Sequence, residues 1–305
     1  MTRRQIVLLL SLALIWGSSF LFIKWGVLEM SPLMVVMGRL VFGLLFLFGA
    51  LVVRGRSLPP LSLWKPLLVV GIVNNAVPWF LIAWGEQYVS SGLASVLNAT
   101  TPFFSVVLAV TWGDEHFSWL KVLGLLLGFV GVNVLIGADL REFFTTASSR
   151  VALGELAILA SAILYAVGAV YARRELRGVP PLQVATGQLG AALLLTLPVL
   201  LVAGDLPATM PSLRALLAVG ALGLFGSGLA YVLFYELLEQ VGATRTVIVT
   251  YLLPVVALFL GWLLLDEPLT VSTLVGMAII LSGVGLVNGI GFRPRRRLPV
   301  QEAAP

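Results

Sequence analysis

Long apolar runs separated by short polar segments are the dominant pattern of this chain. Each run approaches the roughly 20 residues that a helix needs to cross the hydrocarbon core of a bilayer. Charged residues, Gly and Pro mark the breaks between the runs. The pattern predicts ten transmembrane helices, at residues 5–24, 33–53, 66–88, 90–112, 118–137, 152–172, 181–203, 213–237, 242–264 and 270–291.

The overall composition agrees with a membrane location for these runs. Of the 305 residues, 59% are hydrophobic and 11% are charged, and the mean hydropathy is +1.05. A typical soluble domain carries about 25% charged residues, and its core could not hold so many apolar side chains. Pattern and composition together predict an all-α, multi-pass membrane protein whose outer surface faces lipid.

The residue types that the chain lacks exclude several kinds of chemistry. Cysteine is absent and His116 is the only histidine, which excludes disulfides, thiolate metal sites and histidine clusters within one chain. An intramembrane hydrolase would need clustered His or Asp residues, or a Ser–Lys pair, and none is visible. The sequence also contains no Walker motif for ATP. We therefore expect neither an enzyme nor a cofactor.

Basic residues indicate the orientation of the chain. Arg3 and Arg4 precede the first apolar run, and no small-x-small cleavage site follows, so we expect a retained first span rather than a signal peptide. With the N-terminus inside, most Arg and Lys residues fall on the cytoplasmic side. The positive-inside rule then places both termini in the cytoplasm, with the chain in a bacterial-type inner membrane. This topology accounts for the net charge of +5, so we expect no nucleic-acid partner.

An internal repeat relates the two halves of the sequence, with matched positions 149 or 152 residues apart. Because five spans per copy is an odd number, the second copy must cross the membrane in the opposite sense, as in many transporters. We predict a first five-helix repeat at 1–138, a periplasmic connecting loop at 139–151, an inverted five-helix repeat at 152–291 and a cytoplasmic basic tail at 292–305. The matched pairs include Trp16 with Tyr165, Arg39 with Gln188, Asn75 with Ser227, Trp79 with Tyr231, Pro102 with Pro254, and Asp114-Glu115 with Asp266-Glu267.

Several of these positions resemble the EamA type of the drug/metabolite transporter superfamily, and within it most closely the YddG-type exporters of aromatic amino acids. The resembling residues are Trp16-Gly-Ser-Ser-Phe20, Ser31-Pro32 with Arg39, Asn98 to Pro102, Asp114-Glu115 and Asp266-Glu267-Pro268. The resemblance covers about residues 5–291. It implies a ten-helix exporter of small metabolites with a central cavity lined by spans one, three, four, six, eight and nine.

Polar and aromatic residues at helical spacing inside the apolar spans are the candidates for binding a substrate. Such groups are costly in hydrocarbon unless they face a wet cavity or another helix. The alternative is that the hydroxyl and amide groups bond to neighbouring helices, that the aromatic residues anchor span ends, and that the prolines only bend helices. The candidates are Trp16, Asn75, Pro78, Trp79, Asn98, Thr101, Tyr165, Ser227, Tyr231, Tyr235 and Thr250.

Charged residues within the spans are the second group of candidates. Arg39 lies about seven residues into span two, where a charge is expensive. It could attract a substrate carboxylate or tie span two to backbone carbonyls, and we favour the structural role. No Asp or Glu lies at the middle of a span, which disfavours a pump for cationic drugs. Glu155 is the best candidate for a proton site, and we expect Lys24 to extend to the outer interface.

Two further motifs are expected to serve the structure. The acidic pairs Asp114-Glu115 and Asp266-Glu267 follow spans four and nine, and we expect them to cap the next helix at its positive N-terminus. Gly124-x-x-x-Gly128 in span five and Gly285-x-x-x-Gly289 in span ten permit close helix contact, either within one chain or in a homodimer.

These observations together predict a secondary transporter that exports amino acids or similar small metabolites by alternating access. The partners expected are a small-molecule substrate and the lipid bilayer, with the chain a monomer or a homodimer. Uptake, or transport of a nucleobase, sugar or organic acid, is the alternative within transport. A lipid scramblase, a membrane-embedded enzyme or a sensor is the alternative outside it.

Overall fold

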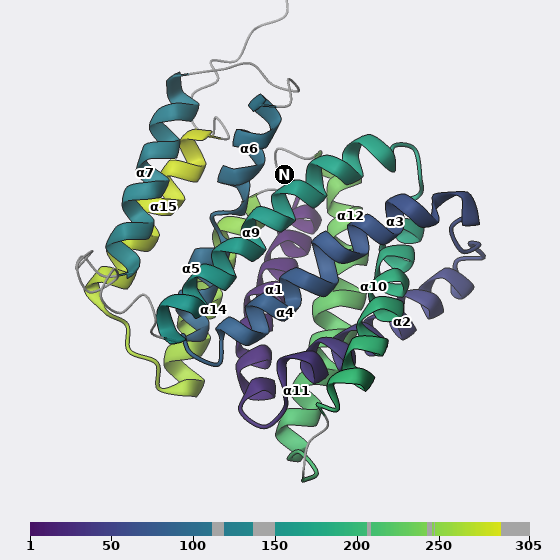
Figure 1. Ribbon diagram of the computed structural model, residues 1–305. Helices are drawn as coiled ribbons and strands as arrows, with labels where there is room; N and C mark the ends of the chain where they lie inside the picture. The colour runs from purple at the N-terminus through teal and green to yellow at the C-terminus, as the bar shows by residue number, and fades with distance from the viewer. Residues whose placement is uncertain (112–118, 137–149, 206–208, 243–245, 247, 288–305) are drawn as a thin grey trace, which may run out of the picture.

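The computed structural model of the chain describes residues 1–111, 119–136, 150–205, 209–242, 246 and 248–287. Every regular element in these ranges is a helix (Figure 1), which confirms the predicted all-α class. Six helical segments are long and apolar enough to cross a membrane, so the chain is a multi-pass membrane protein. The six segments are Arg3–Val27, Pro32–Val53, Leu61–Gly85, Arg150–Glu175, Pro181–Ala203 and Leu213–Val241.

The uninterrupted helices of these segments are α1 (Arg3–Val27), α2 (Pro32–Val53), α9 (Arg150–Glu175) and α10 (Pro181–Ala203). Shorter helices cover most residues of the other four predicted spans. These are α5 (Ser91–Asn98), α6 (Thr101–Thr111), α7 (Trp119–Ile136), α14 (Ile248–Leu265) and α15 (Val271–Val287). The acidic pair at 114–115, most of the connection at 139–151 and the tail at 292–305 lie outside the described residues.

The fourth predicted span at 90–112 is formed by two helices, α5 and α6, with a turn at Ala99 and Thr100 between them. Pro102 has no backbone N–H and cannot bond to the carbonyl of Asn98 one turn earlier. The hydroxyl of Thr101 donates to that carbonyl instead, at 2.7 Å. Proline chemistry therefore sets the break, and Thr101 satisfies the carbonyl that the break leaves free.

Two segments contain a π-helical stretch near their middle. The Leu61–Gly85 segment runs through η1 (Leu61–Leu63), α3 (Trp64–Gly71), the π-helical η2 (Ile72–Ala76) and α4 (Val77–Gly85). The Leu213–Val241 segment runs through α11 (Leu213–Gly223), the π-helical η3 (Leu224–Leu229) and α12 (Ala230–Val241). Their first residues, Ile72 and Leu224, are 152 positions apart, which is the spacing of the internal repeat. Such stretches are rare and occur frequently at functional sites.

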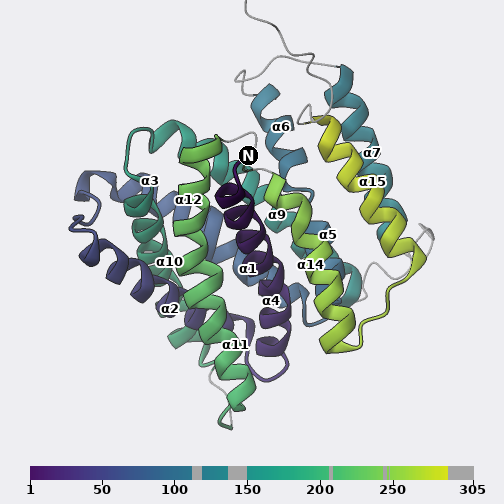
Figure 2. The same cartoon turned by 180° about the vertical axis from the view of Figure 1, so that it is seen from behind.

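The helices pack in reciprocal pairs. Helix α1 contacts α14, and α9 contacts α5 and α6. Helix α2 contacts α11 and η3, while α10 contacts α3 and η2. Figures 1 and 2 show α7 and α15 side by side at one edge of the bundle, with α2, α3 and α10 at the opposite edge.

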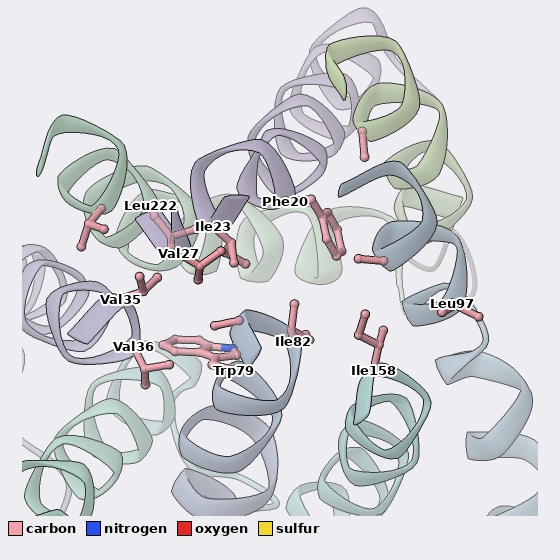
Figure 3. Packing of buried hydrophobic residues seen from close by; sticks show 14 of the residues in the cluster. Phe20, Ile23, Val27, Val35, Val36, Trp79, Ile82, Leu97, Ile158 and Leu222 are labelled. Carbon is pink, nitrogen blue, oxygen red and sulfur yellow. The ribbon is translucent and has the colours of Figure 1, made fainter. Parts of the chain in front are cut away.

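The main core lies where the inner helices converge (Figure 3). Phe20 and Ile23 of α1 face Val36 of α2, Trp79 of α4 and Ile158 of α9, and each of these side chains is at most 4% exposed. Large apolar residues also cover the outside of the bundle, for example along α2 and α10. An apolar exterior around a packed interior is the arrangement that lipid stabilises.

Glycines allow α7 and α15 to pack closely against each other. A Cβ atom added at Gly283 of α15 would lie 2.6 Å from the carbonyl oxygen of Gly124 and 2.9 Å from the backbone nitrogen of Gly128. The glycine pair of α7 therefore serves packing within one chain. A Cβ atom at Gly285 would meet no atom within 4 Å, so this glycine does not serve that contact.

The loop between α1 and α2 is held to the start of α11. The carboxylate of Glu29 accepts hydrogen bonds from the backbone nitrogen of Ser212 at 2.6 Å and from its hydroxyl at 2.7 Å. These hydrogen bonds hold the pKa of Glu29 below its usual range, and the bond from the Ser212 hydroxyl has the larger effect. Ser212 is the N-cap of α11, so an acidic side chain meets a helix N-terminus here.

Candidate functional site

Arg39 lies at the centre of a buried polar cluster between α2, α4, α9 and the middle of the Leu213–Val241 segment. The side chain is 8% exposed, and its Nε donates to the hydroxyl of Ser227 in η3 at 2.9 Å. Within the described residues, no carboxylate forms an ion pair with the guanidinium. The bond to Ser227 ties α2 to η3 through a side chain, where we expected backbone carbonyls, and the structural role stays a prediction.

Trp79 forms one wall of this cluster. The Cζ atom of Arg39 lies 3.7 Å from the centroid of the Trp79 ring, which is a cation–π contact. Such a contact is worth about 2 kcal/mol when both groups are removed from water. Tyr165 of α9 lies close enough to interact with both Trp79 and the guanidinium. Tyr165, which the repeat matches to Trp16, and Trp79, which it matches to Tyr231, therefore both lie beside the guanidinium.

Tyr231 and Asn75 connect the two π-helical segments. The amide nitrogen Nδ2 of Asn75 in η2 donates to the hydroxyl of Tyr231, just after η3, at 3.1 Å. The ring of Tyr235 stacks on that of Tyr231, with centroids 6.2 Å apart and an interplanar angle of 18°. The repeat-matched stripes of the two halves therefore contact each other directly, and six predicted candidates join Arg39 in one group. We call this group the Arg39 cluster: Arg39, Asn75, Trp79, Tyr165, Ser227, Tyr231 and Tyr235.

Trp16 of α1 and Pro78 of α4 are not part of the cluster, but each lies against or next to a π-helical stretch. The indole nitrogen of Trp16 donates to the carbonyl of Gly226 in η3 at 3.1 Å. Pro78 is the second residue of α4, two positions after the end of η2, and it has no N–H, so it leaves the carbonyl of Asn74 without its usual helical donor. The two residues support the irregular backbone that presents Asn75 and Ser227.

The remaining candidates lie elsewhere in the bundle. The side-chain oxygen Oδ1 of Asn98 is buried without a hydrogen-bond partner among the described residues, at the break between α5 and α6. Thr101 is occupied by the carbonyl of Asn98, and Thr250 lies half-buried in α14. Glu155 of α9 is 6% exposed. The contacts of the Arg39 guanidinium are with Ser227 and Trp79 and include none of Asn98, Thr101 and Glu155.

The acidic residue Glu267 caps a helix, but not the one that the sequence suggested. Its carboxylate accepts from the backbone nitrogen and hydroxyl of Ser91 at 2.7 and 3.0 Å, and from the backbone nitrogen of Gly92 at 3.1 Å. These groups form the N-terminus of α5, whereas we expected a cap on α15. The bond links the two halves of the sequence across 176 residues.

Lys24 and Glu86 meet near this cap. The ammonium group of Lys24 donates to the backbone carbonyls of Glu86 and Val89, at 2.5 and 2.9 Å. Its extension to the outer interface stays a prediction. The side chain of Glu86 is fully buried. Its place near a span end gave no sign of that burial, since the neighbours that cover it come from other helices.

An apolar groove of about 590 Å³ lies between α2, α3 and α10. Phe48, Leu61 and Leu194 are among its lining residues, and none of the Arg39 cluster is. In this conformation Asn75, Trp79 and Ser227 are at most 3% exposed, so their helices pack closely at the cluster.

Comparison with known proteins places the chain among membrane transporters. The sequence profile of the EamA-like transporter family matches residues 3–137 and 152–289. The inner membrane transporter YedA of Escherichia coli strain K12 is 32% identical over 92% of this chain and 89% of its own length. The transporter YoaV of Bacillus subtilis strain 168 is 26% identical over 94% and 97% of the two chains.

Two further similarities bear on substrate and fold. The S-adenosylmethionine/S-adenosylhomocysteine transporter of Chlamydia trachomatis serovar L2 is 28% identical, over 92% of this chain and 88% of its own. A solved crystal structure superposes with a TM-score of 0.66 at 21% identity, covering 94% and 96% of the two chains, and shows a shared fold. By its match along both halves and its similarity to YedA, the chain belongs to the EamA-like transporter family.

Proposed function

We propose that the chain is a secondary transporter of the inner membrane that exports neutral amino acids, aromatic ones included, and that it binds the substrate carboxylate at Arg39. One observation carries this proposal. A guanidinium buried without a carboxylate partner among the described residues is electrostatically costly, and a charge at such a depth is a functional candidate by default. A substrate carboxylate would supply the missing opposite charge in a bidentate bond to the guanidinium.

The rest of the cluster suits an amphipathic zwitterion. Trp79, Tyr165, Tyr231 and Tyr235 offer ring faces for an apolar side chain and a weak attraction for an ammonium group. The amide of Asn75 can hold either charged group without adding net charge to the site. This combination favours an amino acid over a nucleobase or sugar, neither of which carries a carboxylate.

Alternating access between two inverted halves is the proposed mechanism. The reciprocal helix contacts, the two π-helical segments at repeat-matched positions and the match of the family profile in two parts all support ten spans arranged as inverted repeats. Rocking of the halves would open the Arg39 cluster to one side of the membrane and then to the other.

The second candidate substrate is a larger amino-acid derivative. One relative is named as a transporter of S-adenosylmethionine, a compound with an α-amino-acid group and an adenine ring. Arg39 and the stacked tyrosines could accept both parts. None of the relatives described above is named for amino acids, so the YddG-type export of aromatic amino acids rests on the sequence resemblance.

Flux in proteoliposomes tests the proposal. The full chain would be reconstituted and assayed with labelled Phe, Trp, Thr, Met, S-adenosylmethionine and a nucleobase. We expect at least one of the five carboxylate-bearing compounds to move, with little flux of the nucleobase. Flux of the nucleobase alone would contradict the proposal.

Labelling of introduced cysteines tests the topology, since the natural chain has none. Ser148→Cys lies in the connection at 139–151, outside the described residues, and Thr2→Cys lies at the N-terminus. We expect a membrane-impermeant thiol reagent added to intact cells to label the first position and not the second. Labelling of both from the same side would rule out two five-helix halves of opposite orientation.

A further inference from the structure

Glu86 is a carboxylate that the transport proposal leaves without a role. It follows α4 as the C-cap residue and is 0% exposed. Neither Oε1 nor Oε2 has a hydrogen-bond partner in the part of the chain that the structure describes. Glu86 comes seven residues after Trp79, so it lies about 10 Å further along the same helical face than the Arg39 cluster.

The charged neighbours of Glu86 are all engaged elsewhere. Lys24 of α1, Glu267 and Arg39 of α2 act on it electrostatically, but none contacts its carboxylate. Lys24 binds two backbone carbonyls, Glu267 binds the N-terminus of α5, and Arg39 binds Ser227. Helix α9 also packs on α4 and contributes a second buried acid, Glu155.

A carboxylate in this setting is far more stable as the neutral acid. The ionised form would lie in an apolar interior without a donor or a contacting cation, which is among the most costly states for a side chain. Binding one proton removes the charge and breaks no other bond. We propose that Glu86 is a proton-binding site, which holds one proton from the aqueous phase while this end of the bundle is closed.

The surrounding contacts couple this proton to opening. The connection between α4 and α5 is held to α1 by Lys24, and the first residues of α5 are held by Glu267, which lies in the connection between α14 and α15. Opening this end to water requires these bonds to break, which hydrates Glu86 and frees the Lys24 ammonium beside it. The carboxylate then ionises and releases its proton to that side, so proton release and opening occur together. This inference does not depend on the substrate.

Infrared spectroscopy of the purified full chain in lipid tests the proposal without a substrate. The spectrum at pH 7 contains a carbonyl band from protonated carboxyl groups, and we expect Glu86→Gln to lower it by one group. Glu267→Gln is the matched control, because the carboxylate of Glu267 accepts three hydrogen bonds whereas that of Glu86 accepts none among the described residues, and it should leave the band unchanged. An unchanged band in Glu86→Gln would overturn the proposal.

Thermal unfolding of the same variants gives a second readout. Glutamine has the shape of the neutral acid, so we expect Glu86→Gln to unfold at pH 7 at a temperature no lower than that of the wild type. Glu267→Gln should unfold at a lower temperature, because it loses a charged cap. A large fall in the unfolding temperature of Glu86→Gln would show that the ionised form is needed, and would also overturn the proposal.

Discussion

Ser227→Ala tests the contact that orients Arg39. The substitution removes one oxygen atom and leaves the Nε group of Arg39 without its acceptor, 2.9 Å away in the wild type. Hydrogen bonds to charged groups contribute about 1.5–3 kcal/mol to stability, whereas hydrogen bonds between membrane helices average about 0.6 kcal/mol. Because this donor is charged and both residues are buried, we expect the loss of stability to be in the larger of these two ranges.

Ser161→Ala is the matched control for this measurement. Ser161 is also 0% exposed, but its hydroxyl donates only to the carbonyl of Ile158 in its own helix, at 2.6 Å. Reversible unfolding in mixed micelles would give the free energy of unfolding of both variants. We expect a decrease of about 1.5–3 kcal/mol for Ser227→Ala and less than about 1 kcal/mol for Ser161→Ala.

Transport should separate the two variants in the same way. A guanidinium that has lost its orienting contact should bind the substrate carboxylate about tenfold more weakly, equivalent to about 1.4 kcal/mol. We therefore expect the half-saturation concentration of flux to rise about tenfold in Ser227→Ala and to stay unchanged in Ser161→Ala. Equal effects of both substitutions on stability and flux would refute the reasoning.

Three further predictions concern other parts of the molecule. Trp79→Ala should cut flux strongly while expression stays near normal, and a loss of expression with unchanged flux per molecule would assign this residue to packing. Gly283→Ala should destabilise the protein by about 1–3 kcal/mol, because its Cβ would meet backbone atoms, whereas Gly220→Ala, with no atom within 4 Å, should not destabilise it. The lowered pKa of Glu29 means that its ionised form stabilises the fold fully above the usual value of about 4.3, and that this stabilisation is lost as the pH falls through the lowered pKa. Acid unfolding curves of wild type and Glu29→Gln should therefore differ at neutral pH and converge in acid.

The membrane class and many of the candidate residues could be predicted from the sequence. Apolar runs and helical spacing are local properties, and both are fixed by the order of residues. The repeat identified the pairs Trp79 with Tyr231 and Asn75 with Ser227 as equivalent positions. It could not show that Asn75 bonds to Tyr231, because that contact joins different halves.

Interactions between distant segments account for what the sequence did not predict. Glu267 lies in the connection between α14 and α15, and the packing of α14 against α5 brings it to Ser91. Arg39 could be recognised as a buried charge, but not its position over the Trp79 ring. The π-helical stretches Ile72–Ala76 and Leu224–Leu229 were also unpredicted.

Ligand-induced stabilisation of the purified protein tests the central claim, that Arg39 binds a substrate carboxylate. A ligand that binds only the folded state stabilises it and therefore raises the unfolding temperature. At a ligand concentration of 100 times the Kd, the free energy of unfolding rises by about 2.7 kcal/mol. Each amino acid that moves in the flux assay would be compared with the alcohol that replaces its carboxylate, in wild type and in Arg39→Gln. We predict that the amino acid stabilises the wild type alone and that the alcohol stabilises neither protein. Equal stabilisation by the alcohol, or undiminished stabilisation of Arg39→Gln, would contradict the claim.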